Sequence, residues 1–149
     1  MRRASIPLAR ISLGVVFIWF GALKVIGESP ANDLVARTVY WVDPEWFLPL
    51  LGWWEIVIGV CLIDPLRWLR LPPWLTRAGI LLLLLQVPGT FLPLVILPNV
   101  CFVDAPLAPT LEGQYIIKNL VLIAAAIAIG GTVRADQVRA EAAAGGSTI

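Results

Sequence analysis

The stretch Arg10–Lys24 (RISLGVVFIWFGALK) decides how we expect this chain to fold. It is an apolar run long enough for most of a membrane span, with one charge at each end. Residues spaced 4, 3, 4 and 3 apart share one narrow stripe of a helix, and here they are Arg10, Gly14, Phe17, Gly21 and Lys24. A stripe of charge and glycine should face protein, because lipid cannot satisfy it. We therefore expect the other helices to gather around this stripe.

The composition of the whole chain is that of a membrane protein. Of its 149 residues, 59% are hydrophobic and 14% are charged, whereas soluble domains have about 45–50% and about 25%. The formal net charge of +1 argues against a nucleic-acid partner. The chain has no histidine, which removes the usual haem and zinc ligand and the commonest general base. We predict no catalytic residues and no metal site.

Four apolar stretches are long enough to cross a bilayer. They predict an all-α fold, a four-transmembrane-helix bundle within one domain over residues 1–131. The predicted spans cover about residues 7–26, 46–63, 75–97 and 113–131. A polar tail follows over residues 132–149.

The loops add local predictions. Ser29-Pro30 is typical of a helix start, and the apolar residues after it repeat at helical spacing. We expect a short interfacial helix in this first outer loop, ended by Asp43-Pro44. Pro88-Gly89 predicts a kink in the third span, because proline cannot donate to the helix ladder. A proline-rich outer loop should cover residues 99–112.

The basic residues predict that both termini are cytoplasmic. They cluster before the first span, around the turn at residues 64–74 and in the tail, whereas the two remaining loops carry Arg37 alone. Those loops hold six acidic residues: Glu28, Asp33, Asp43, Glu45, Asp104 and Glu112. By the positive-inside rule, we expect a multi-pass protein of the cell inner (cytoplasmic) membrane, with its N- and C-termini in the cytoplasm.

The start of the chain and its two cysteines carry further expectations. A basic start before an apolar run resembles a signal peptide, but the run is too long and no A-x-A-like cleavage site follows, so we expect a retained first span. Cys61 and Cys101 should lie near opposite membrane faces, too far apart for a disulfide.

Polar or small residues occupy one face of every predicted span. Small residues let helices approach closely and polar side chains bond across the gap, so we expect these faces to turn inward. Counted from the helix ends, Lys24 and Lys118 lie near the outer surface, and Glu55 and Gln86 lie deeper. The candidate ligand-binding residues of this outward-facing set are Lys24, Glu55, Gln86, Thr90, Gln114, Lys118 and Asn119.

The same residues allow a purely structural interpretation. Glu55 neutralised by Lys24 or Lys118 would hold the helices in register, and lysines near helix ends can snorkel to the headgroups. An ionisable residue in a span is a functional hypothesis by default, so both interpretations stay open. We expect Arg10 to anchor to headgroups, and most of the seven tryptophans to form an interfacial belt.

Three stretches resemble the DoxX-like superfamily of small four-span bacterial membrane proteins: RISLGVVFIWFGALKVIG, GWWEIVIGVCLI and GQYIIKNLVLIAAAIAIGG. The first two also resemble its DUF417-related branch. The shared motifs are G-x-x-K ending at Lys24, E-x-x-x-G starting at Glu55, and the pair Lys118-Asn119. The third span does not share the likeness. The resemblance implies a four-span fold and a redox or oxidative-stress setting rather than a particular reaction.

Several functions fit this pattern. The first is a small accessory or ligand-binding subunit that holds a quinone, a lipid headgroup or a small anion. The second is a transporter or channel working as an oligomer, and the third is a structural subunit of a larger complex. Autonomous enzyme activity has little visible machinery beyond a Glu55–Lys118 pair. The expected partners are membrane lipid and either a larger membrane redox complex or a homo-oligomer, with no cofactor other than a bound quinone or lipid.

Overall fold

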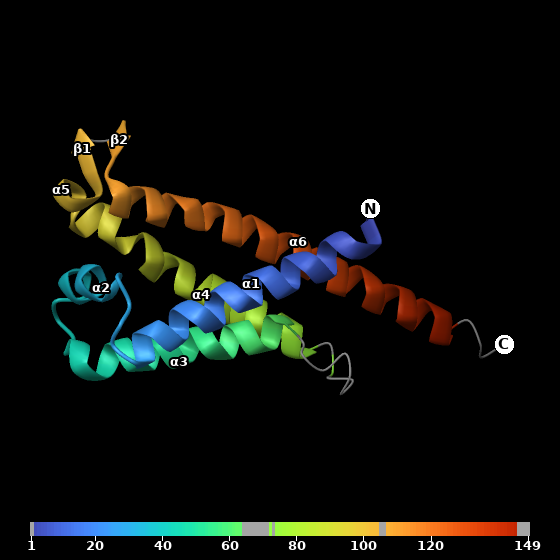
Figure 1. The fold of residues 1–149 in the computed structure, drawn as a ribbon. Coiled ribbons are helices and arrows are strands. Elements are labelled where there is room, and N and C mark those ends of the chain that lie inside the picture. Colours follow the sequence, from blue (N-terminus) through green and yellow to red (C-terminus); the bar gives the residue numbers. More distant parts are fainter. Residues whose placement is uncertain (1, 64–71, 73, 105–106, 146–149) are drawn as a thin grey trace.

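The computed structural model describes residues 2–63, 72, 74–104 and 107–145. Four long helices dominate it, with a short helix between the first two (Figure 1). The elements are α1 (Arg2–Val25), α2 (Asn32–Thr38), α3 (Pro44–Ile63), α4 (Trp74–Ile96), α5 (Pro98–Cys101), β1 (Phe102–Asp104), β2 (Ala108–Pro109) and α6 (Leu111–Gly145). The predicted four-helix bundle is therefore confirmed. Most of the predicted basic turn, and residues 146–149 of the tail, lie outside the described residues.

The membrane-length segments agree with the predicted spans to within two residues at each end. They are Ser5–Val25, Pro44–Ile63, Trp74–Ile96 and Leu111–Thr132. Helix α6 continues beyond its span to Gly145, so the first part of the tail is helical. Helix α4 stays helical across both of its internal prolines, and the kink at Pro88-Gly89 remains a prediction.

Two helix starts differ from expectation for a local reason. Asp43-Pro44 begins α3 rather than ending α2, because the Asp43 carboxylate accepts a hydrogen bond from the Glu45 N–H and proline fits the first helical turn. Likewise, Ser29 does not cap α2. Its hydroxyl accepts from the Ala31 N–H in a turn that precedes the helix.

Helix α1 ends in a glycine-capped turn. Gly27 has a φ of 81°, which glycine adopts without the steric penalty of a Cβ. Its N–H donates to the Lys24 carbonyl, and the Glu28 N–H donates to the Leu23 carbonyl. This pair of backbone hydrogen bonds is a Schellman motif. It ends α1 at Val25, the residue after Lys24, and turns the chain toward α2.

Helices α1 and α3 form the most closely packed pair, and they run antiparallel (Figure 1). Gly21 lies against Gly52, and Gly14 lies against Gly59, so two rungs seven residues apart join the helices. A Cβ added at Gly21 would stand 2.5 Å from the Gly52 carbonyl oxygen, and one added at Gly52 would stand 2.6 Å from the Gly21 oxygen. Only glycine permits this approach. The expectation that the Arg10–Lys24 stripe faces protein is confirmed.

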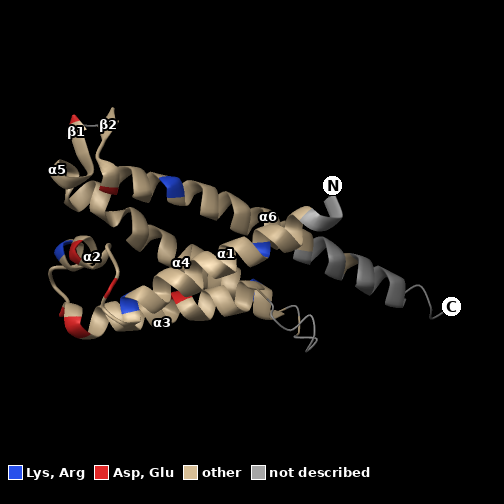
Figure 2. Cartoon of the chain, viewed as in Figure 1, with Lys and Arg blue, Asp and Glu red and all other residues tan. Residues whose placement is uncertain are grey.

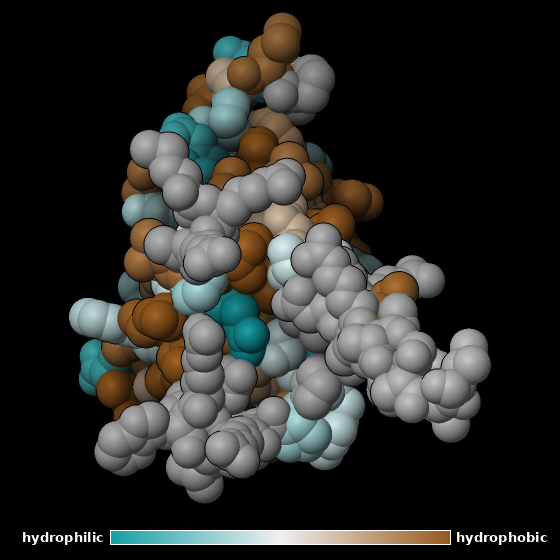
Figure 3. Space-filling view, turned by 90° about the vertical axis from the view of Figure 1, so that its right-hand side faces the viewer, coloured by the Kyte–Doolittle hydropathy of each residue, from teal (hydrophilic) through white to brown (hydrophobic). Residues whose placement is uncertain are grey.

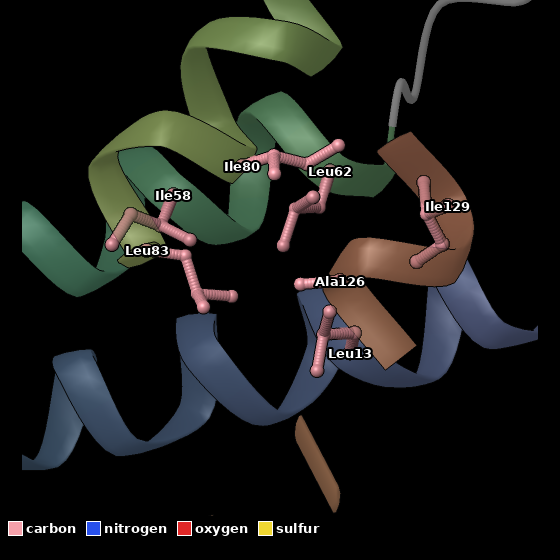
Figure 4. Packing of buried hydrophobic residues seen from close by; sticks show 7 residues of the cluster. All are labelled: Leu13, Ile58, Leu62, Ile80, Leu83, Ala126 and Ile129. Carbon is pink, nitrogen blue, oxygen red and sulfur yellow. The ribbon is translucent and has the colours of Figure 1, made fainter. Parts of the chain in front are cut away.

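The apolar core draws on all four long helices (Figure 4). Its buried members point toward one another from α1, α3, α4 and α6: Leu13, Ile58, Leu62, Ile80, Leu83, Ala126 and Ile129. These residues lie in the half of the bundle nearer the N-terminus. The other half contains the contacts of Lys24 with Glu55 that are described below.

The segment after α4 is more ordered than the predicted proline-rich loop. Helix α5 leads into β1, which pairs antiparallel with β2, Phe102 opposite Pro109. Thr110 then caps α6, its hydroxyl oxygen accepting from the Gly113 N–H. We refer to the end of the bundle that carries α2 and this hairpin as the α2 end.

Charged residues are sparse along the long helices and gather at the α2 end (Figure 2). The start of α1 and the end of α6 lie at the opposite end (Figure 1). Seen from that opposite end, the described surface shows hydrophilic residues between hydrophobic ones (Figure 3). The cytoplasmic placement of the termini remains a prediction.

Candidate functional site

Three of the predicted site residues meet in one buried network. The Lys24 ammonium donates to Glu55 Oε2 at 2.7 Å. The Gln86 Nε2 donates to Glu55 Oε1 at 2.8 Å. Lys24 and Glu55 are each only 7% exposed. The network, which we call the triad, joins α1, α3 and α4 through a carboxylate whose two oxygens both accept a hydrogen bond.

Helix direction explains why Lys24 reaches inward. Every Cα–Cβ bond leans toward the N-terminus of its own helix. The Lys24 side chain therefore leans away from the α2 end, whereas the Glu55 side chain on the antiparallel α3 leans toward it. The two side chains converge, although glycine pairing sets Glu55 deeper in the bundle than Lys24. Lys24 is thus paired within the protein rather than snorkelling outward.

Two buried polar side-chain atoms, one in the triad and one in the residue that precedes Glu55, have no hydrogen-bond partner among the described residues. They are the Trp54 Nε1 and the Gln86 Oε1. Trp54 precedes Glu55 in α3 and packs against the apolar core. A buried polar atom without a partner costs about 1–3 kcal/mol, so such atoms mark places where another group can bind. Here one is a donor and the other an acceptor.

Trp19, Trp53 and Trp54 are near enough in sequence to the polar set that we expect them to line or flank it. Among them, Trp54 packs against the apolar core, because it shares one face of α3 with Ile58 and Leu62, which are fully buried. By contrast, Trp53 is 57% exposed and Trp19 is 65% exposed, as belt or lipid-facing residues should be.

Thr90 lies one turn beyond Gln86 on α4. Its hydroxyl donates to the Gln86 backbone carbonyl at 3.3 Å. The side chain therefore bonds within its own helix and makes no hydrogen bond to a side chain of the triad. Gly89 beside it has nothing within 4 Å of the position where a Cβ would stand. Gly89 is itself exposed, so this open space lies at the outer surface of helix α4.

The expectation that the polar face of α6 turns inward is wrong. Gln114 and Lys118 are exposed, and neither contacts the triad. The Lys118 ammonium lies 5.2 Å from the centre of the Tyr115 ring in its own helix. Asn119 is half-buried, and its amide donates to the Tyr115 carbonyl at 3.3 Å.

A close contact at the start of α6 sets its rotation. Gly113 faces α5 so closely that a Cβ there would collide with the Cys101 carbonyl. Lys118 follows five residues later and therefore lies about 140° around the helix. The buried face instead carries Ile116, Ala126 and Ile129. A helical wheel shows which residues share a face, but the direction of that face depends on such contacts.

Arg10 ties three helices together rather than serving only as a headgroup anchor. Its Nε donates to the Leu62 carbonyl at 3.1 Å, near the end of α3. Its Nη2 donates to the Thr76 hydroxyl at 2.8 Å, in the first turn of α4. The guanidinium satisfies a carbonyl at a helix C-terminus, where a cation is favourable.

Other features of the described residues lie away from the triad. Both cysteines are free and buried, Cys61 against Gly79 near the start of α4 and Cys101 against Pro93 near its end. No group of three His, Cys, Asp or Glu side chains in the described ranges could hold a metal ion. A surface hollow of about 380 Å³ lies on the outer face of α1, lined only by apolar residues.

Comparisons of the chain with protein-family models, with curated proteins and with solved structures found no match. The fold and composition define the class: a small integral membrane protein with four spans. Within that class, the particular protein is distinguished by a buried Lys–Glu–Gln triad that joins three of the four spans.

Proposed function

We propose that this protein is a small accessory or ligand-binding subunit of the cytoplasmic membrane that holds the neutral headgroup of a quinone beside the triad. The observation that carries the proposal is the pair of buried, unpartnered atoms, Trp54 Nε1 and Gln86 Oε1. The indole N–H can donate to a quinone carbonyl, and the amide oxygen can accept from a quinol hydroxyl.

Charge balance favours a neutral headgroup over a small anion. The only buried cation that the triad offers, Lys24, is already neutralised by Glu55 at 2.7 Å. The second cation that an anion site would need, Lys118, lies on the exposed face of α6. An anion would therefore meet a site of no net charge and would lose its hydration without compensation.

The resemblance to the DoxX-like superfamily adds the redox setting to this proposal. In that setting the subunit would hold or hand over quinone for a larger membrane complex. The proposal assigns the chain no reaction of its own, since both oxygens of Glu55 already accept hydrogen bonds and neither is left as a free base.

Binding of ubiquinone-1 to the purified protein in lipid nanodiscs, measured by isothermal titration calorimetry, tests the proposal. Each lost hydrogen bond between neutral groups should weaken binding by about three- to tenfold. We expect that loss for Trp54→Phe with ubiquinone-1, and for Gln86→Met with the reduced form ubiquinol-1, whose hydroxyl can donate to the amide oxygen. Trp53→Phe is the matched control, because this neighbouring indole is 57% exposed, and its affinity should equal that of the unmodified chain.

Two results would overturn the proposal. One is that ubiquinone-1 does not bind to the unmodified chain. The other is binding that Trp54→Phe and Gln86→Met leave unchanged. Circular dichroism of each variant separates a lost contact from a lost fold.

A further inference from the structure

The orientation of the Gln86 amide is fixed by the group that it contacts. Glu55 is paired with the Lys24 ammonium at 2.7 Å, so its carboxylate is held in the charged form, which can only accept hydrogen bonds. Gln86 must therefore turn its N–H side to Glu55, and its Nε2 lies 2.8 Å from Glu55 Oε1. The oxygen of the same amide is buried and has no partner among the residues that the structure describes.

An acceptor fixed in this way distinguishes the two oxidation states of a quinone headgroup. The carbonyl oxygens of the oxidised form only accept hydrogen bonds, so they can take the Trp54 N–H but offer nothing to the Gln86 oxygen. A hydroxyl of the reduced form, the quinol, both accepts and donates. Only the quinol can therefore satisfy both of these buried atoms.

The surroundings of the two atoms make this difference important. Trp54 packs against the apolar core, and so does Val87, the residue that follows Gln86. A polar atom left unpaired in such surroundings is costly, because no bulk water reaches it to replace the missing hydrogen bond. A bound quinone would leave the Gln86 oxygen in that condition, whereas a bound quinol would relieve it.

We propose that the Lys24–Glu55 pair is a positioning element that makes this site selective for the quinol. The inference rests on the proposed function, because it concerns the same headgroup site. Lys24 keeps Glu55 charged, Glu55 holds the N–H side of Gln86, and the amide oxygen then accepts from the ligand hydroxyl. Only binding is involved, and the ligand gains or loses no electron or proton. This role explains why an ion pair that is costly to bury lies one hydrogen bond away from a site for a neutral ligand.

Anaerobic isothermal titration calorimetry of the purified protein in lipid nanodiscs compares ubiquinol-1 with ubiquinone-1, and empty nanodiscs correct for partition into lipid. One additional hydrogen bond between neutral groups should make ubiquinol-1 bind about three- to tenfold more tightly. Gln86→Met should lower the affinity for ubiquinol-1 to that for ubiquinone-1. Trp54→Phe is the matched control, because both forms accept from the indole N–H. It should weaken the binding of both and leave the ratio of their affinities unchanged.

Glu55→Gln provides a readout that a merely structural role of Glu55 would not change. The introduced amide should offer its oxygen to the Lys24 ammonium and its N–H to Gln86. The Gln86 amide should then turn over and present its own N–H to the ligand. Ubiquinone-1 accepts from both donors in that arrangement, so the preference should reverse in favour of the oxidised form.

The outcomes separate this inference from the proposed function. Equal affinities of the unmodified chain for the two forms would overturn the inference, as would a preference for ubiquinol-1 that persists in Gln86→Met or in folded Glu55→Gln. Binding of either form would still support the proposed function, whereas failure of both forms to bind would overturn both. If circular dichroism shows that Glu55→Gln does not fold, the affinity ratios of the unmodified chain and Gln86→Met decide, because the preference requires the amide orientation that Glu55 imposes.

Discussion

Removing one member of the Lys24–Glu55 pair should be far more damaging than removing both. At 2.7 Å and an effective dielectric constant of about 20, the two charges attract each other by about 6 kcal/mol. Burial of each charge opposes that gain, since both side chains are more than nine-tenths buried. The net contribution of the pair is therefore small. A single partner left alone keeps the desolvation cost and loses the attraction.

The expected magnitudes follow from that balance. Lys24→Met and Glu55→Met should each lower the free energy of unfolding by about 3–5 kcal/mol. The double variant should lose less than either single variant, because methionine fills similar volume without a charge. Far-UV circular dichroism during reversible unfolding in mixed dodecyl maltoside and dodecyl sulfate micelles measures all four states of this double-mutant cycle.

Lys118→Met provides the matched control. It removes a lysine at the same end of the bundle from an exposed position, and it should change the free energy of unfolding by no more than about 0.5 kcal/mol. If the losses of the two single variants simply add in the double variant, Lys24 and Glu55 do not stabilise each other. The reasoning about the triad would then be refuted.

Two further predictions concern packing and a thiol. Gly21→Ala puts a Cβ 2.5 Å from the Gly52 carbonyl and should cost about 1–3 kcal/mol in the same unfolding assay, whereas Gly89→Ala, with nothing within 4 Å, should cost nothing. Burial and then the charge of Glu112 raise the pKa of the Cys101 thiol above its ordinary value of 9.0. Its alkylation by N-ethylmaleimide in a Cys61→Ala background should therefore be slow at neutral pH and accelerate above pH 9. Glu112→Gln should move that profile to lower pH, and an unmoved profile would contradict the assignment.

The sequence predicted those parts of the fold that depend on the length of apolar runs and on the helical spacing of residues. Apolar run length fixed the four spans, because a bilayer core requires about twenty apolar residues in a row. The stripe from Arg10 to Lys24 was identified correctly because it contains two glycines in phase with two charges. Its partner face on α3 repeats the same seven-residue glycine spacing at Gly52 and Gly59. The two faces therefore match each other, and the helices pack closely along them.

The part of the site on α6 could not be predicted in the same way. Its polar stripe repeats at the same helical spacing as the stripes of the other three spans. That spacing shows which residues share a face of the helix, but not which way the face turns in the bundle. The decisive contact is a collision that any side chain at Gly113 would make with the Cys101 carbonyl. That contact depends on α5 and the hairpin, which the sequence presented only as a proline-rich loop. Similarly, the bonds from Arg10 to Leu62 and Thr76 depend on where two other helices end and begin.

Chain direction adds a second reason, besides the rotation of α6, for the different behaviour of the two lysines. Side chains lean toward the N-terminus of their helix. Helix α1 finishes at the α2 end, so Lys24 leans into the bundle and meets Glu55. Helix α6 starts at that end, so Lys118 leans back toward the helix start, where its ammonium lies over Tyr115. In a bundle of alternating direction, a lysine near the end of one helix is therefore available for a buried pair, whereas a lysine at similar depth near the start of another is directed toward the membrane surface.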